Sequence, residues 1–133
     1  MKILLDTSVC IDFLRRKAST IERLMAFKSR DILIPAHAVS ELEHGVYLAQ
    51  RRKEARQHTD ALLEKFRVLP FETAGARRAG FLMYELGRHG LTMKYFDLMI
   101  AAQAIDAGLT LATADADFEA LSGVRGLKLA KWV

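Results

Sequence analysis

Four acidic residues stand where short apolar runs end or where a helix is expected to begin, and we call them the acidic cluster: Asp6, Glu41, Asp97 and Asp115. One carboxylate at the end of a strand is common, but several at the same kind of position indicate that they converge in the fold. Converging carboxylates repel one another and lose solvent together, which either raises their pKa values or requires a cation. The pattern therefore predicts a metal-binding acidic site.

The types of side chain available favour a hard cation. Cys10 is the only cysteine, so an internal disulfide or a cysteine-rich zinc site is excluded. We interpret His37 and His44 as surface or core histidines rather than ligands, because no His-x-x-x-His pair occurs. Carboxylate oxygens suit Mg²⁺ or Mn²⁺. Such an ion can activate a water and stabilise the leaving oxygen in phosphodiester hydrolysis.

Other acidic motifs fit the sequence less well. A phosphoaspartate enzyme would show Asp-x-Asp on its first strand, whereas Asp6 is followed by two hydroxyl residues. Residues 115–117 do form Asp-x-Asp, as in topoisomerase–primase metal sites, but the order of the other acids does not match that arrangement. A Gly-rich phosphate loop and a dinucleotide fingerprint are both absent from the sequence. Each acid alone is also explained as a helix cap, so the metal hypothesis depends on the whole cluster.

The elements that position these acids follow from the apolar pattern. Strands are expected at residues 3–5, 31–35, 68–71, 109–113 and 127–132, and helices at residues 9–15, 20–27, 36–50, 51–66, 73–88 and 98–107. Strands that alternate with helices imply a three-layer α/β/α domain around a small parallel sheet, and we expect one domain over residues 1–133. Ligands of such sheets bind beyond the carboxyl ends of the strands, where the strand order reverses.

Capping and helix-ending residues predict where the helices begin and end. Thr7 or Ser8 is expected to cap the first helix and Thr73 the fifth, while Gly90 and Gly108 are expected to end the helices before them. Aromatic residues recur at helical spacing, and we expect them in the core rather than stacked on bases: Tyr47, Phe81, Tyr84 and Tyr95.

Charge and hydropathy describe a basic chain without a membrane segment. The net charge is +4, and with the acidic cluster neutralised by metal the remainder would carry +8. A basic body around an acidic pocket suits nucleic acid, although a solubilising surface excess also explains the charge. The basic residues 15–17 are expected to flank the pocket, and residues 51–53 to be plain surface. The apolar runs are too short for a membrane span or a signal peptide, so we expect a cytoplasmic protein.

The sequence resembles the PIN-domain ribonucleases, and more closely the VapC-type toxins of bacterial toxin–antitoxin pairs. The resemblance runs from residue 2 to residue 132. Single motifs are weak, but their order and separation are specific: LLDTSV at 4–9, SELEHG at 40–45, DLMIAA at 97–102 and LATADADF at 111–118.

The resemblance implies a metal-dependent endoribonuclease. Asp6, Glu41 and Asp97 match the acids that bind the catalytic metal, Mg²⁺ or Mn²⁺, and Asp115 matches a further acid that completes the site or holds a second ion. Asp117 is expected to cap or support rather than to bind metal.

Neighbouring polar positions also fit the resemblance. Thr7 and Ser8 match a small polar pair, with Ser8 in place of the commoner Asn, and Thr113 matches a hydroxyl residue of the pocket. Lys94 departs from the small residues usual before Asp97, and it either reaches a phosphate or is a solvated lysine.

Partners are implied in the same way. The expected partners are an RNA substrate, often transfer RNA, a second copy in a homodimer, and a cognate VapB-type antitoxin. An antitoxin Arg inserted among the acids would compete with the metal by charge. The alternatives are a PIN-domain nuclease without an antitoxin, and a catalytically silent module that binds RNA or protein.

Overall fold

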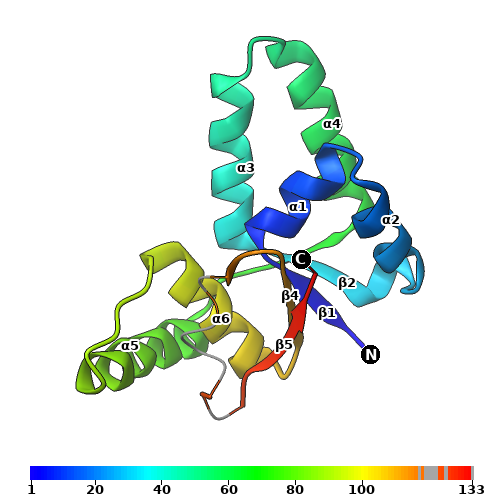
Figure 1. Ribbon diagram of the computed structural model, residues 1–133. Coiled ribbons are helices and arrows are strands. Elements are labelled where there is room, and N and C mark those ends of the chain that lie inside the picture. The colour runs from blue at the N-terminus through cyan, green and yellow to red at the C-terminus, as the bar shows by residue number, and fades with distance from the viewer. Residues whose placement is uncertain (117, 119–122, 125, 133) are drawn as a thin grey trace.

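The computed structural model describes residues 1–116, 118, 123, 124 and 126–132 (Figure 1). These residues form a parallel five-stranded sheet in the order β3-β2-β1-β4-β5. The strand bounds are β1 Ile3–Leu5, β2 Ile32–Pro35, β3 Arg67–Leu69, β4 Thr110–Thr113 and β5 Lys128–Lys131. Every strand that the apolar runs predict is confirmed, and the last one is an edge strand.

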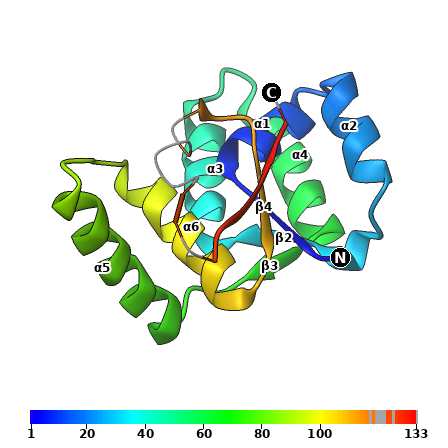
Figure 2. The same cartoon turned by 60° about the horizontal axis from the view of Figure 1, so that its bottom comes forward.

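Helices cover both faces of the sheet (Figures 1 and 2). Their bounds are α1 Thr7–Leu14, α2 Ala18–Met25, α3 Ala36–Leu48, α4 Arg52–Lys65, α5 Thr73–Arg88 and α6 Tyr95–Ala107, with a 3₁₀ turn η1 at Ser29–Asp31. The chain moves from β1 through β2 to β3 in one direction and then returns to β4. Right-handed crossovers therefore place α1–α4 on one face and α5 and α6 on the other. The expected three-layer α/β/α architecture is confirmed.

The strand order reverses between β1 and β4, which pair with Leu4 opposite Leu111 and Leu5 opposite Ala112. Helices α1 and α3 follow β1 and β2, so both begin at the carboxyl edge of the sheet. Helix α6 runs against the strands because it leads into the start of β4, so its first turn lies at the same edge. This topology brings the helix that carries Asp97 to the ends of β1 and β4.

The core lies between the two helical layers. Strand β1 is fully buried, since Ile3, Leu4 and Leu5 expose 0% of their surface. Helix α6 is buried along residues 98–104, which include three alanines that allow close approach to the sheet and to α5. Burial on both faces explains why the central strands read as continuous apolar runs.

Two of the expected helix caps are wrong. The N-cap of α1 is Asp6, whose side chain accepts a hydrogen bond from the Val9 N–H, so neither Thr7 nor Ser8 caps it. Thr73 is the first residue of α5, and the N-cap position is Glu72. The expected stops are confirmed, because Gly90 and Gly108 follow their helices with φ of 67°, a conformation that favours glycine.

The expectation of buried aromatics is also wrong. The side chains are more than half exposed: Tyr47 57%, Phe81 56%, Tyr84 62% and Tyr95 57%. Helical spacing puts residues on one face of a helix, but it does not say whether another element covers that face. Among the described residues, no helix is long and apolar enough to cross a membrane.

Candidate metal centre

Asp6 is the most constrained member of the acidic cluster. It follows β1 directly, is 2% exposed, and accepts hydrogen bonds on Oδ1 from the Val9 N–H at 3.0 Å and the Ser8 hydroxyl at 2.6 Å. The Thr113 hydroxyl of the neighbouring strand β4 donates to Oδ2. Burial raises the pKa of Asp6 above its ordinary value, these hydrogen bonds oppose the rise, and the charge of Asp115 adds to it.

Glu41 is oriented from a different helix. It lies in α3, where the Thr7 hydroxyl of α1 donates to its Oε1 at 2.6 Å. The Ser8 hydroxyl, which donates to Asp6, also accepts the Ala114 N–H at 3.1 Å. Thr7 and Ser8 therefore each fix one acid of the cluster, a role that their cap-like residue types had concealed in the sequence.

Asp97 differs from Asp6 at one of its two carboxylate oxygens. It lies in the first turn of α6, and among the described residues its buried Oδ2 has no hydrogen-bond partner. Burial, together with the charges of Asp115, Asp6 and Glu41, raises the pKa of Asp97 to about 6, against an opposing effect of Lys94. All members of the acidic cluster are thus close enough to share one electrostatic environment.

Asp115 is placed by the turn after β4. Its backbone N–H donates to the Thr113 hydroxyl at 2.9 Å, so the residue that holds Asp6 also shapes the turn that carries Asp115. Asp117, for which a capping or supporting role is expected, lies outside the described residues.

The donor atoms of the cluster suit a hard divalent cation, although the side chains are not arranged around a single point. Within the described part of the chain, no three His, Cys, Asp or Glu side chains are arranged so that they could hold a metal ion. The donor set is nevertheless all oxygen, the other acids raise the pKa of Asp97, and its Oδ2 is buried without a hydrogen-bond partner among the described residues. A cation would relieve each of these costs, so metal binding by the cluster stays a prediction.

A groove begins beside the cluster, and we call it the Glu41 groove. It has a volume of about 460 Å³, and its lining includes Ile11, Leu14 and Arg15 at α1, Glu41, Leu42 and Val46 of α3, and His58 of α4. An adjoining pocket of about 570 Å³ shares Leu14 and His58 and continues to Met25 of α2. No motif in the sequence predicts this groove, because its walls come from three helices that come together only in the folded chain.

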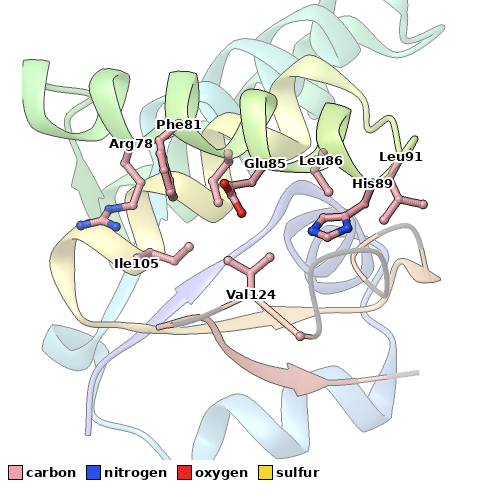
Figure 3. A pocket seen from close by; sticks show the side chains of 10 residues that line it. Arg78, Phe81, Glu85, Leu86, His89, Leu91, Ile105 and Val124 are labelled. Atoms are coloured by element: carbon pink, nitrogen blue, oxygen red, sulfur yellow. The ribbon is translucent and has the colours of Figure 1, made fainter.

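A separate cavity of about 520 Å³ lies beside α5 (Figure 3). Its lining is mostly apolar, with polar side chains from Arg78, Glu85 and His89. It includes no member of the acidic cluster, so we do not assign the predicted chemistry to it.

Comparison with known proteins places the fold and the cluster in context. The sequence matches the PIN domain family over residues 3–124. The chain belongs to the PIN-domain family. It is 36% identical over 112 residues to ribonuclease VapC10 of Mycobacterium tuberculosis (strain CDC 1551 / Oshkosh), which covers 84% of this chain and 80% of the relative. It is 27% identical over 126 residues to the tRNA(fMet)-specific endonuclease VapC of Shigella flexneri, covering 94% and 96%. Within the family the chain therefore belongs with the VapC ribonucleases.

Solved structures agree with this placement. DNA-bound VapBC from Salmonella typhimurium superposes on this PIN domain with a TM-score of 0.90 at 25% identity, covering 100% of this chain and 99% of the other. VapBC2 from Rickettsia felis, bound to a promoter DNA fragment, gives a TM-score of 0.91 at 24% identity and full coverage of both chains. The second likeness supports the fold alone.

Asp97 should make the metal-free protein sensitive to pH. The pKa of Asp97 is raised from 3.8 to about 6, so protonation of this group stabilises the folded state. That contribution to the free energy of unfolding is complete below pH 3.8 and is lost as the pH rises through about 6. Asp97→Asn should therefore stabilise the metal-free protein at pH 7.5, by on the order of 1 kcal/mol, because the side chain is only partly buried. Urea unfolding in EDTA across pH 4–8 measures this.

The matched control is Asp106→Asn, which removes the same charge from the exposed far end of α6. It should leave the loss of stability near pH 6 in place. Parallel stability curves for the parent and Asp97→Asn across this range would show that the Asp97 carboxylate is not under electrostatic stress.

Proposed function

We propose that this chain is a divalent-metal-dependent endoribonuclease, the toxin of a toxin–antitoxin pair, acting as a single PIN domain. The acidic cluster would hold the metal, with Mg²⁺ as the expected ion and Mn²⁺ as a substitute. The observation that carries this proposal is the Asp97 Oδ2, which is buried without a hydrogen-bond partner in the described structure and lies within the field of the other acids. The proposed substrate is RNA, with transfer RNA as the first candidate because the Shigella flexneri relative is named for it.

The chain's own residues prepare the acids for this chemistry. A divalent ion at the cluster would supply an activated water and neutralise charge on the phosphodiester. Ser8 and Thr113 fix both oxygens of Asp6, and Thr7 holds one oxygen of Glu41. These hydrogen bonds fix the orientation of both carboxylates, so neither side chain has to be ordered when a cation binds.

Helix ends at the same edge suit an anionic substrate. Helices α1, α3 and α6 all begin there, and their N-terminal N–H groups carry partial positive charge. The N-cap residues of α3 and α6, Pro35 and Lys94, make no side-chain capping hydrogen bond. Their first-turn N–H groups therefore lack a side-chain acceptor at the N-cap, and a phosphate oxygen would be a favourable acceptor.

Arg15 is a basic residue placed to contact RNA bound at the cluster. It lines the Glu41 groove together with Glu41 itself. Lys17 is engaged elsewhere, because its Nζ lies 3.6 Å from an Asp12 carboxylate oxygen. Of the basic residues 15–17, which we expect to flank the pocket, Arg15 is therefore our candidate for a phosphate contact.

The same groove suits an antitoxin segment. Similar solved structures are VapBC complexes, and we infer a VapB-type partner for this chain. The apolar residues of the Glu41 groove would receive apolar side chains of the partner, and Glu41 at its end would attract an Arg. For the homodimer we favour α5, because Phe81, Met83 and Tyr84 expose large apolar surfaces on it.

Neutralising one acid should abolish cleavage. Asp6→Asn and Asp97→Asn should each lower the rate of Mg²⁺-dependent cleavage of a transfer RNA mixture by roughly 100-fold or more, since changes to groups behind a metal ligand already cost 10–100-fold. Gel analysis of cleaved RNA at saturating Mg²⁺ measures this, with Asp106→Asn as the active control. Cleavage by Asp97→Asn at the parent rate would refute the proposed mechanism.

Arg15 should act on substrate binding. Arg15→Gln should raise KM for RNA several-fold with kcat little changed, and it should reduce the slope of log KM against log salt by about one. Arg51→Gln, a matched change at an exposed residue between α3 and α4, should leave both quantities unchanged. Equal effects of the two substitutions would mean that only overall charge matters.

A further inference from the structure

His37 occupies a position between three elements at the carboxyl edge. It lies in the first turn of α3, and its ring meets Phe71, which follows β3, with centroids 4.4 Å apart and planes at 86°. It also meets Phe96 of α6 at 5.6 Å and 67°. Both contacts are edge-to-face, the arrangement that aromatic rings favour.

Ring contacts, and not a hydrogen bond at Nδ1, hold this side of the imidazole. Its Nδ1 is buried and, among the described residues, has no hydrogen-bond partner. The packing of the ring therefore carries the interaction, and a phenyl ring of similar shape should be able to replace it.

These contacts connect the helices that carry two members of the acidic cluster. His37 lies four residues before Glu41, so the two share one face of α3. Phe96 immediately precedes Asp97 in α6. The contact between His37 and Phe96 is a direct restraint between the first turns of the two helices. No side-chain capping hydrogen bond holds the start of either helix, so this ring contact matters more.

We propose that His37 is a positioning residue, which sets the separation of Glu41 and Asp97 by fixing the first turn of α6 against that of α3. This inference rests on the proposed function, because it assumes that both acids bind metal. Truncating His37 would remove the ring against which Phe96 packs. Phe96 is already 44% exposed, so the turn that carries Asp97 would then gain freedom.

The test measures Mn²⁺ affinity by the electron paramagnetic resonance signal of the free ion, on variants shown by circular dichroism to be folded. His37→Ala should weaken Mn²⁺ binding by roughly 10-fold, as expected for a group behind a metal ligand. His37→Phe should restore the parent affinity within about 2-fold, because it restores the ring contacts. His44→Ala, at an exposed histidine of the same helix, should match the parent.

Phe96→Leu provides a second route to the same contact. Because Phe96 is half exposed, this variant should fold even if His37→Ala does not, and it should weaken Mn²⁺ binding several-fold. RNA cleavage by either variant should need correspondingly more Mn²⁺ to reach half its maximal rate. A role in folding alone would lower the melting temperature and leave the Mn²⁺ affinity unchanged.

The outcomes separate this inference from the proposed function. If the parent does not bind Mn²⁺, the proposed function fails, and the positioning role fails with it. If the parent binds Mn²⁺ and Asp6→Asn does not, but both His37→Ala and Phe96→Leu bind like the parent, the positioning role alone is overturned. Loss of binding in His37→Phe would also overturn it, since the ring would then be insufficient.

Discussion

The central constraint on this structure is that several carboxylates are brought together and partly desolvated at one edge of the sheet, so that their charges must be compensated. Burial raises the pKa of both Asp6 and Asp97, the charge of Asp115 adds to the rise at both, and the charge of Asp6 adds to the rise at Asp97. Groups arranged in this way oppose folding at neutral pH unless something compensates. Hydroxyl donors compensate at Asp6 and Glu41, whereas no donor among the described residues reaches the Asp97 Oδ2. The uncompensated oxygen is therefore the place where a cation would be most stabilising.

The acids lie at this edge because the order of the strands in the sheet reverses after β3. Strands β1 and β4 are neighbours although they are far apart in the chain, and α6 runs against them so that its first turn returns to their carboxyl ends. The same reversal brings the N-terminus of α6 to the edge where α1 and α3 begin, and a groove between α1, α3 and α4 starts at Glu41. In the proposed function, metal, substrate phosphate and antitoxin would all bind to one set of charges, so a partner that supplied a cation of its own would compete with the metal.

Much of this architecture could be predicted from the sequence. Buried parallel strands appear in a sequence as short continuous apolar runs. Asp6 and Asp115 closely follow two of these runs, so the sequence predicts that both acids lie at the carboxyl edge of the sheet. The roles of Thr7 and Ser8 could not be predicted, because Asp, Thr and Ser are all good N-caps and these two hydroxyls act through residues distant in the sequence. Thr7 donates to Glu41, and Ser8 accepts the Ala114 N–H, 106 positions away. The exposure of Tyr84 and the contact of His37 with Phe96 depend likewise on which helix faces are covered.

The most direct test of metal binding by the acidic cluster is anomalous X-ray diffraction from crystals of the chain equilibrated with Mn²⁺. The account predicts an anomalous peak at the carboxyl edge of the sheet, bound by the Asp97 Oδ2 and by at least one oxygen of Asp6 or Asp115. The same peak should be missing from crystals of Asp97→Asn. A peak bound at other residues, or no peak at this edge under saturating Mn²⁺, would contradict it.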